Sequence, residues 1–238
     1  MKALILNSGL GHRMGALTSE HPKCMTEISG TETILSRQLK LLSANGVNEV
    51  VMTTGYFDKV LVDYCDSLGL PITFTFVNNP LYAETNYIYS IYCAKDQLDD
   101  DIVLMHGDLV FEESVLKDIL ASESSAMKVS STIPLPEKDF KAVIKHGYVL
   151  KVGIDFFEDA MEAQALYKLN RADWNKWLSK IIEFCENDNR KVYAENALNE
   201  LNGACAIKAL DVKDRLCSEI DTPEDLAIVT GRLAEIET

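Results

Sequence analysis

Two glycines and two basic side chains lie within the first 25 residues of the chain and could bind a phosphate group. Gly9 and Gly11 follow a short apolar run, and Arg13 and Lys23 come shortly after them. Glycines let the backbone turn tightly and present bare N–H groups to an anion, because a side chain there would hold the phosphate away. Residues 1–25 carry three basic side chains and one acidic one, so this stretch has a net charge of +2 in a chain of net charge −14. The positive charge therefore lies beside the glycines.

Three interpretations fit this glycine turn. It could be a plain connection between a strand and a loop, in which the glycines only shape the turn. It could be a dinucleotide-binding turn, but that turn requires a helix directly after the glycines and an acidic residue near the end of the second strand. Residues 17–22 are instead a polar loop that ends in proline, and the expected second strand, 49–54, ends without Asp or Glu. We favour the third interpretation, a loop around a nucleoside triphosphate with Arg13 and Lys23 on the outer phosphates.

Two aspartates could hold a metal ion beside such a triphosphate. Asp108 follows an expected strand at 102–105, and Asp221 precedes Thr222 and Pro223, which are typical of a helix start. An aspartate in either position is often a turn or capping residue, so the positions alone leave both interpretations open. Mg²⁺ prefers oxygen ligands and keeps several waters, so two carboxylates would suffice for it.

Strands and amphipathic helices alternate along the first 133 residues and must position these side chains. The continuous apolar run at 2–6 is too short for a helix and is typical of a strand buried on both faces. The elements expected after it are helix 32–44, strand 47–54, helix 57–68, strand 72–77, helix 87–98, strand 102–105, helix 112–122 and strand 127–133. This alternation predicts an α/β fold with a Rossmann-like, mostly parallel (mixed) sheet flanked by helices, whose ligands bind beyond the carboxyl ends of the strands.

The pattern changes after residue 133. Short strands are expected at 140–144, 148–152 and 163–168, with a hairpin at 145–147, and helices at 171–187 and 223–236. This region predicts a small β-rich insert in which an acceptor site would be built. We expect a single domain, 1–238, with a nucleotide-binding core at 1–133 and an acceptor-binding part with a closing helix at 134–238.

The composition excludes several classes of protein. A chain of 238 residues with 47% hydrophobic residues can bury a core, and a net charge of −14 argues against non-specific binding to nucleic acid or an anionic membrane. No apolar run approaches ~18 residues and no signal-peptide pattern is present, so we expect a cytoplasmic protein. The six cysteines lie far apart and predict free, mostly buried thiols. Cys24, beside Lys23, is the thiol expected to react with alkylating agents when the site is empty.

Three stretches of the chain resemble motifs of one enzyme family. Leu-Asn-Ser-Gly-Leu-Gly-His-Arg-Met at 6–14, followed by Pro22-Lys23, is similar to the Leu-Ala-Ala-Gly-x-Gly-x-Arg-Met…Pro-Lys signature of nucleotidyltransferases. Met-His-Gly-Asp at 105–108 resembles the metal-binding Gly-Asp of that family, and 218–226 resembles its carboxy-terminal Glu-Ile-Asp-Thr-Pro-Glu-Asp-Leu. Asn7-Ser8 replaces the usual Ala-Ala, and His12 stands where Ser is common, so contacts to the base and ribose are expected to differ.

The family includes sugar-phosphate nucleotidyltransferases and the cytidylyltransferases of phosphocholine and 2-aminoethylphosphonate. Thr-Asn-Tyr-Ile-Tyr-Ser-Ile at 85–91 resembles the Asn-Asn-x-Tyr-Ser-Leu of the cytidylyltransferases and favours that branch. The resemblance implies a Mg²⁺-dependent enzyme that transfers CMP from CTP to a small phosphorylated or phosphonate amine or amino acid and releases pyrophosphate. The alternatives are a sugar-1-phosphate nucleotidyltransferase that uses UTP or dTTP, and a non-catalytic nucleotide-binding module.

The resemblance also implies residue roles. It places Asp108 and Asp221 on Mg²⁺, Lys23 on the transferring and leaving phosphates, and Arg13 on the β and γ phosphates, which makes these four the expected catalytic residues. The expected nucleotide contacts are Leu6, Asn7, Ser8, Gly9, Gly11, Arg13, Lys23, Thr85, Asn86 and Asp108. The expected acceptor contacts are Lys141, Trp174, Tyr193 and Glu195. Trp174 could instead pack in the core, and Glu195 could instead cap a helix. Assembly as a homodimer stays open.

Overall fold

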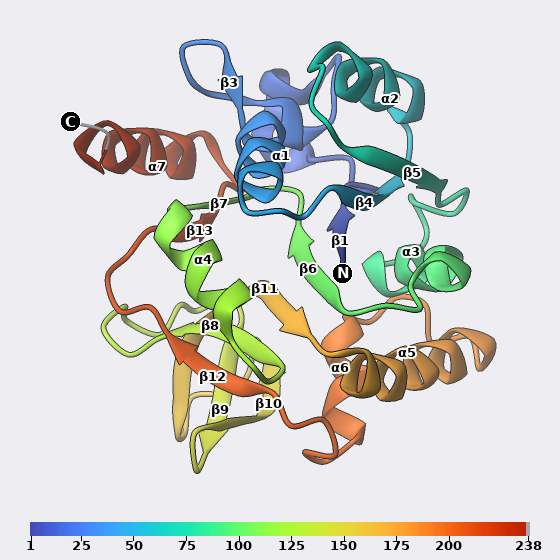
Figure 1. Cartoon of the computed structure of the whole chain (residues 1–238), viewed down its shortest axis with the longest axis vertical. Helices are drawn as coiled ribbons and strands as arrows, with labels where there is room; N and C mark the ends of the chain where they lie inside the picture. Colours follow the sequence, from blue (N-terminus) through green and yellow to red (C-terminus); the bar gives the residue numbers. More distant parts are fainter. Residues whose placement is uncertain (237–238) are drawn as a thin grey trace.

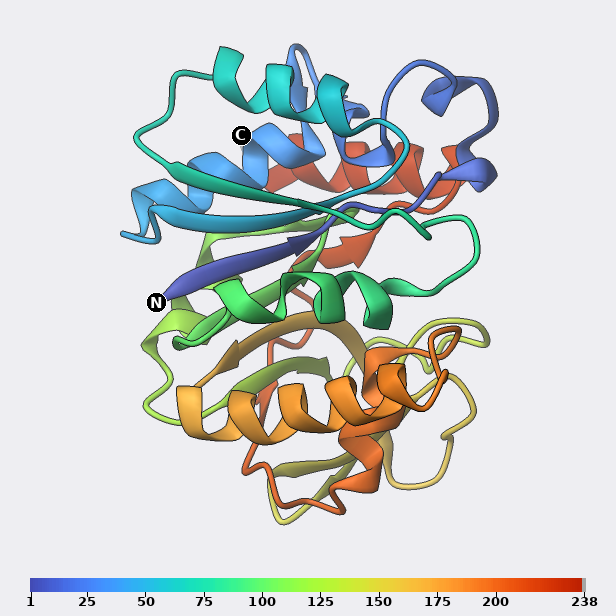
Figure 2. The same cartoon turned by 90° about the vertical axis from the view of Figure 1, so that its right-hand side faces the viewer.

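A nine-stranded mixed sheet runs through the molecule (Figures 1 and 2). The structure is a computed structural model, and it describes residues 1–236 apart from the side chain of His12. Its strands lie in the order β5 (Thr73–Asn78), β4 (Glu49–Thr54), β1 (Lys2–Leu6), β6 (Ile102–His106), β11 (Ala160–Leu169), β8 (Ala126–Ser130), β12 (Lys208–Asp211), β10 (Tyr148–Gly153) and β9 (Lys141–Lys145). Strands β5, β4, β1 and β6 pair in parallel, whereas β11 is antiparallel to β6 and β8. The predicted α/β fold with a mixed sheet is confirmed.

Helices cover both faces of the sheet. The helices are α1 (Ile34–Ala44), α2 (Asp58–Ser67), α3 (Tyr87–Ala94), α4 (Glu113–Ala121), α5 (Arg171–Glu186), α6 (Ala194–Glu200) and α7 (Pro223–Ile236). Alternate residues of β1 enter different cores, because successive side chains of a strand point to opposite faces. Ala3 and Ile5 pack with α1, α2 and α4, whereas Leu4 and Leu6 pack with α3, α5 and α6. Figure 1 shows α1 and α4 on the opposite side of the sheet from α3 and α5.

Strand β11 differs from its expected place. Residues 163–168 were expected to form a short strand of the β-rich insert, but β11 is ten residues long and lies in the middle of the large sheet. It is held there by pairing with β6 on one side and β8 on the other. Strands from both sides of residue 133 therefore share one sheet, and the division into a core and an acceptor-binding part stays a prediction.

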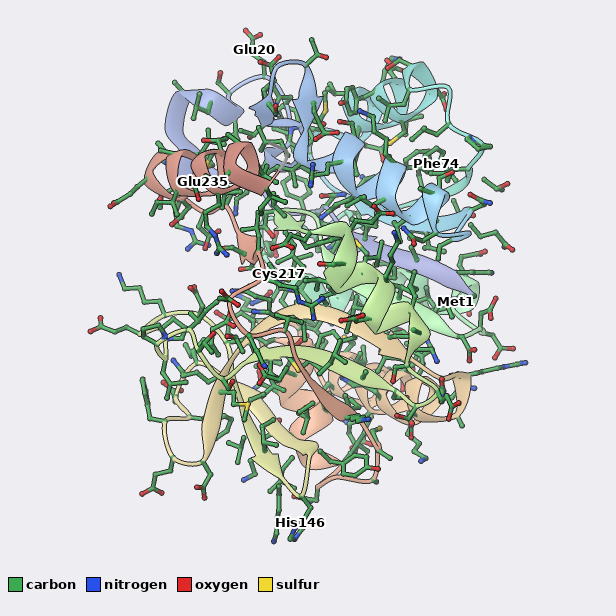
Figure 3. The ribbon with its side chains drawn as sticks, turned by 60° about the vertical axis from the view of Figure 1, so that its left-hand side comes forward. Met1, Glu20, Phe74, His146, Cys217 and Glu235 are labelled. Atoms are coloured by element: carbon green, nitrogen blue, oxygen red, sulfur yellow. The ribbon has the colours of Figure 1, made fainter. Side chains whose placement is uncertain are left out.

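The hairpin expected at 145–147 is present. Strands β9 and β10 pair with Lys145 opposite Tyr148, and His146 and Gly147 between them both have positive φ (54° and 82°). Two such residues form the tight turn that suits the twist of a hairpin. His146 lies at the tip of this hairpin (Figure 3).

Several short elements were not predicted. Strands β7 (Leu109–Phe111) and β13 (Cys217–Glu219) form a separate two-stranded ribbon, as do β2 (Glu27–Ser29) and β3 (Glu32–Thr33). Short 3-10 helices follow β1 (η1, His12–Thr18, which is kinked at Gly15; η2, Lys23–Met25) and α3 (η3, Lys95–Gln97). No helix among residues 1–236 combines the length and apolar character needed to span a membrane.

The close approach of two loops at the ends of β1 and β4 leads to a prediction about stability. A Cβ atom on Gly55 would lie 2.4 Å from the carbonyl oxygen of Ser8, so Gly55→Ala must displace the backbone. We expect this variant to lose about 1–3 kcal/mol of unfolding free energy, measured by urea denaturation.

The matched control is Gly231→Ala in α7, where a Cβ would meet no atom within 4 Å. Because alanine favours a helix over glycine, this variant should be as stable as the parent or gain about 0.5–1 kcal/mol. Equal stability of the two alanine variants would contradict the predicted clash.

Candidate active site

The loop after β1 forms one wall of a cavity at the carboxyl edge of the sheet. Gly11 has a φ of +66°, and a Cβ there would lie 3.1 Å from the Cβ of Lys23, so a side chain would be strained and crowded. The cavity has a volume of about 320 Å³. We call it the glycine-loop cavity, and it is lined by Leu6, Asn7, Gly9, Gly11, Arg13, Pro22, Lys23, Cys24, Gly107, Asp108 and Asp221.

The four expected catalytic residues meet at this cavity. The Lys23 ammonium lies 2.6 Å from Oδ2 of Asp108 and also donates a hydrogen bond to Oδ1 of Asp221. The Arg13 guanidinium lies 2.7 Å from Oδ2 of Asp221. Two cations thus face two carboxylates in one cluster, which is neutral overall.

The β7–β13 ribbon brings the two aspartates together. Glu219 pairs with Leu109, and the backbone N–H of Ile220 donates to the carbonyl oxygen of Asp108 over 3.0 Å. This pairing places Asp221 beside Asp108, although they are 113 positions apart in the sequence. The ribbon is therefore the element that completes the charge cluster.

The charges in the cluster hold one another in the ionised state. Burial alone would lower the pKa of Lys23, but Asp108 and Asp221 outweigh it and raise that pKa above its usual value. Burial alone would raise the pKa of Asp108, but Lys23 and then His106 lower it. At neutral pH the cluster is therefore a set of ion pairs.

The same aspartates offer a suitable ligand set for Mg²⁺. Oδ1 of Asp108 is buried and has no hydrogen-bond partner among the described residues. The oxygen donors of Asp108 and Asp221 are of the kind that Mg²⁺ prefers, and a cationic group, the Lys23 ammonium, already lies between them. These two residues fit the ion and would hold it.

His106 and Glu219 extend the cluster and were missed from the sequence. Nδ1 of His106 lies 2.7 Å from Oε1 of Glu219, and ligand atoms of these two residues and Asp108 lie within 4.8 Å of one another. Burial alone would lower the pKa of His106, but Glu219 outweighs it and raises that pKa to about 9. His106 lies in the stretch 105–108 and Glu219 in the stretch 218–226. Both stretches resemble motifs of the family, and this resemblance was the sequence signal that could have identified the two residues.

A second, smaller cavity of about 200 Å³ adjoins the first through Leu6, Gly9 and Asp108. Thr85 and Asn86, both expected nucleotide contacts, lie in its wall, and Asn86 caps α3 by accepting from the N–H of Tyr87. We call it the small cavity. Its lining is Leu6, Ser8, Gly9, Asn79, Tyr82, Thr85, Asn86, Tyr87, Ser90, His106 and Asp108.

A third cavity, of about 370 Å³, lies on the other side of the charge cluster. Tyr193, an expected acceptor contact, is in its wall with its ring centroid 5.1 Å from that of Phe140 and 6.0 Å from that of Tyr87. We call it the aromatic cavity. Its lining is Arg13, Asn86, Tyr87, His106, Lys138, Asp139, Phe140, Ile154, Tyr193, Glu219 and the two aspartates of the cluster.

Glu195 lies behind this wall. Its carboxylate is fully buried and accepts hydrogen bonds from the hydroxyl groups of Tyr87 and, over 3.0 Å, Tyr167. Glu195 and Tyr193 both line an adjoining cavity of about 370 Å³. Among the expected acceptor contacts, Tyr193 therefore reaches the aromatic cavity directly and Glu195 supports it through Tyr87.

The structure does not bring the other two expected acceptor contacts to these cavities. Trp174 is fully buried in the core, where its indole N–H donates to the carbonyl oxygen of Leu98 over 2.9 Å. The Lys141 ammonium is also buried and donates to the carbonyl oxygen of Pro136, with the Phe157 ring 4.2 Å away. Neither side chain can meet an acceptor in this structure, and both have a packing role.

The expectation about Cys24 also changes. Cys24 lines the glycine-loop cavity, but it is only 1% exposed and burial raises the pKa of its thiol well above the usual value. The thiolate that would react with an alkylating agent is thus disfavoured, contrary to the expected reactivity. The contacts expected to differ at His12 lie outside the described side chains.

Comparisons with known proteins show the family and the fold to which the chain is similar. Residues 3–138 match the family model described as the MobA-like NTP transferase domain. The chain is 28% identical to the CTP:phosphoglutamine cytidylyltransferase of Campylobacter jejuni, over 96% of this chain and 98% of that protein. The inositol-1-phosphate CTP transferase from T. maritima has a similar structure, with a TM-score of 0.80 at 21% identity over 98% of this chain and 96% of that chain. The CTP:phosphocholine cytidylyltransferase from Streptococcus pneumoniae gives a TM-score of 0.77 at 20% identity over 98% of both chains.

The family match and the full-length relative from Campylobacter jejuni show that the protein is a nucleotidyltransferase. Since the matched region spans more than half of the chain, the protein belongs to the MobA-like NTP transferase family.

The contact between His106 and Glu219 leads to a prediction about titration. Replacing Glu219 by Gln removes the main charge that raises the pKa of His106, so that pKa should fall from about 9 towards or below its usual 6.5. The shift can be followed by NMR of the imidazole protons, with Glu113→Gln on the surface of α4 as the control.

The raised pKa also fixes the sign of a pH effect on stability. While Glu219 is ionised, the contribution from the raised pKa of His106 is fully present at about pH 6.5 and is lost as the pH rises through about 9. The Glu219→Gln variant should therefore lose less stability than the parent between these pH values. An unchanged pH dependence would contradict the ion pair.

Proposed function

We propose that the protein is a Mg²⁺-dependent cytidylyltransferase, which transfers CMP from CTP to a small phosphorylated or phosphonate amine or amino acid and releases pyrophosphate. The observation that carries this proposal is the cluster of Arg13, Lys23, Asp108 and Asp221, which lies between the glycine-loop cavity and the aromatic cavity. The relative from Campylobacter jejuni, whose name gives CTP and phosphoglutamine as substrates, supports the choice of nucleotide and acceptor class.

In this reaction an anionic oxygen of the acceptor attacks the α-phosphorus of CTP. The new oxygen–phosphorus bond forms as the bond to the β-phosphate oxygen breaks, and pyrophosphate leaves with that electron pair. No general base is required, because the attacking oxygen is already ionised. The barrier comes from repulsion between two anions and from charge on the leaving group, so the protein must supply positive charge and alignment. Mg²⁺ on Asp108 and Asp221 would supply part of that charge.

The basic side chains supply the rest. The Lys23 side chain is largely buried and held by two carboxylates, so its ammonium has a fixed position beside the place where the cavities meet. That position suits contacts to the transferring and leaving phosphates. The Arg13 side chain is 68% exposed, which suits it to the outer β and γ phosphates at the mouth of the cavity.

The aromatic cavity suits an acceptor with an ammonium group. Asp139 and Glu219 line it in addition to the two aspartates of the cluster, and the rings of Tyr87, Phe140 and Tyr193 form part of its wall. Aromatic rings and carboxylates both attract a cation. The phosphate of such an acceptor would face Arg13 and the cluster, while its ammonium group would lie towards the aromatic wall.

Pyrophosphate release tests the proposal. The enzyme would be incubated with Mg²⁺ and CTP, UTP, dTTP or GTP against phosphocholine, 2-aminoethylphosphonate, phosphorylated amino acids and sugar 1-phosphates. We expect release with CTP and an amine-bearing acceptor, abolished by Asp108→Asn and retained in the surface control Asp63→Asn. Release with sugar 1-phosphates alone would overturn the acceptor class. Nucleotide binding without release for any acceptor would favour a non-catalytic module.

The position of Lys23 leads to a prediction about turnover. Replacing Lys23 by Met removes a preorganised cation from the leaving phosphates and should raise the barrier by about 2.7–4 kcal/mol, which is roughly a 10²- to 10³-fold loss in kcat. Steady-state kinetics at saturating CTP would measure it. The control is Lys59→Met, because Lys59 is exposed on α2 and pairs with Asp63 on the same helix. A loss in kcat below tenfold would contradict the role of Lys23.

A further inference from the structure

A cavity of about 370 Å³ adjoins the aromatic cavity on the side away from the charge cluster. The two cavities share Asn86, Ile154 and Tyr193 in their walls, but no residue of the charge cluster lines this one. We call it the outer cavity. Since cavities of roughly 300 Å³ and more hold small ligands, the outer cavity has room for a chemical group of its own. An acceptor that starts at the cluster can therefore extend past Tyr193 into it.

Hydrogen bonds hold the walls of the outer cavity in place. The end of β10 and the loop after it form one wall, and the segment that leads into α6, with α6 itself, forms the other. Asn199 joins the two walls, because its side chain accepts from the N–H of Val152 and donates to the carbonyl oxygen of Val152, both over 2.8 Å. The backbone N–H of Asn86 donates to the carbonyl oxygen of Arg190 over 2.8 Å and ties the second wall to the start of α3. The cavity is therefore formed before a ligand binds.

Each wall carries a charge that is open to a ligand. Asp155 belongs to the first wall and Lys191 to the second, and both side chains are exposed. Neither forms an ion pair or a hydrogen bond with the other or with any other described residue. The side-chain amide of Asn196, in the second wall, is likewise exposed and has no partner among the described residues. Glu195 also lines the cavity, but it is fully buried and already accepts hydrogen bonds from two tyrosine hydroxyl groups.

These side chains match a zwitterion. An α-amino acid carries a carboxylate and an ammonium group on one carbon, so its carboxylate can bind the Lys191 ammonium and the Asn196 amide. Its ammonium group can bind the Asp155 carboxylate and the face of the Tyr193 ring. A simple amine has no carboxylate and would leave Lys191 without a counter-ion in the bound state. The outer cavity therefore suits an amino acid better than an amine.

We propose that the outer cavity binds the amino acid end of the acceptor, which makes the acceptor a phosphorylated or phosphonate α-amino acid. Lys191 binds its carboxylate and Asp155 binds its ammonium group, while its phosphate or phosphonate group lies at the charge cluster. This inference rests on the proposed function and deepens it, because it selects one acceptor class and names the side chains that recognise it.

The first measurement compares acceptors that differ only in the carboxylate. Suitable pairs are O-phosphoserine with phosphoethanolamine, O-phosphohomoserine with 3-aminopropyl phosphate, and 2-amino-5-phosphonopentanoate with 4-aminobutylphosphonate. These pairs also vary the distance from phosphorus to the carboxylate. Pyrophosphate release with Mg²⁺ and CTP gives kcat and KM for each acceptor. In at least one pair we expect the member with the carboxylate to have a KM about tenfold lower, because it gains a charged hydrogen bond. The kcat values should be similar, because the outer cavity lies away from the reacting atoms.

The second measurement repeats this comparison with variants of the outer cavity. Lys191→Met should raise the KM of the acceptor with the carboxylate to that of its partner and leave the partner unchanged, whereas Lys191→Arg should keep the difference. Asp155→Asn should raise the KM of both members, because both carry the ammonium group. All three variants should keep the Tm of the parent, since the replaced side chains are exposed and unpaired.

The matched control is Lys145→Met. Lys145 is exposed at the end of β9 and lies outside the lining of the aromatic cavity and the outer cavity. Its replacement removes the same charge from the surface of the protein. It should change neither KM.

Failure of this inference can be told apart from failure of the proposed function. If the parent uses both members of every pair equally well, or prefers the amines, the inference is overturned and the proposed function stands. If Lys191→Met raises the KM of both members alike, the contact between Lys191 and the carboxylate is overturned. If CTP gives no pyrophosphate with any of these acceptors, both the proposed function and the inference fail.

Discussion

The ammonium group of Lys23, held between the carboxylates of Asp108 and Asp221, is the interaction on which the site depends. It joins residues that are 85 and 198 positions apart in the sequence. Two carboxylates this close in a partly buried site would repel each other, and a buried charge without a partner is strongly destabilising. Parallel pairing of β1 with β6 brings the glycine loop to Asp108, and pairing of β13 with β7 brings Asp221 to the same place. The sheet and the ribbon thus serve to assemble one ion-pair cluster.

The cluster also determines how two anionic substrates could meet. Arg13, Asp108 and Asp221 line both the glycine-loop cavity and the aromatic cavity, so the charges form the shared wall of two spaces. The two spaces differ in chemistry. The cluster residues Arg13, Asp108 and Asp221 line both cavities; the first adds bare glycine backbone and Lys23, whereas the second adds aromatic rings, Lys138 and two further carboxylates. In the proposed reaction, the triphosphate would bind in the first cavity and the amine-bearing phosphate in the second. The acceptor oxygen would then face the α-phosphorus across the cluster, so the two cavities would align the reacting atoms.

The sequence predicted the alternating half of the fold, because that half depends on local signals. The grouping of Arg13, Lys23, Asp108 and Asp221 in one site came instead from the resemblance to nucleotidyltransferase motifs, since these residues lie far apart in the sequence. The apolar run of β1, the helical stripe of α1 and the glycine turn are each readable from a few neighbouring residues. The aromatic cavity depends instead on tertiary contacts. Tyr87, Phe140 and Tyr193 come from three separate segments, and no local pattern links them. Trp174 was ambiguous for the same reason, since only the position of α5 against the core decides whether its ring meets a ligand or Leu98. Strands β7 and β13 have three residues each, which is too short for a periodic signal.

The pattern of stability across the site follows from these contacts. Many buried polar side chains have partners, as in the capping box of Thr33 and Ser36 at the start of α1. At the end of β1, Nδ2 of Asn7 and Oγ of Ser8 are buried and have no hydrogen-bond partner among the described residues, which is also true of Oγ1 of Thr26 and Oε1 of Gln38. The side chains of Asn7 and Ser8 are attached to a rigid strand end, where backbone hydrogen bonds from Asn7 to Thr53 already fix the chain. A donor that is fixed and desolvated before a ligand arrives loses little further entropy when it binds.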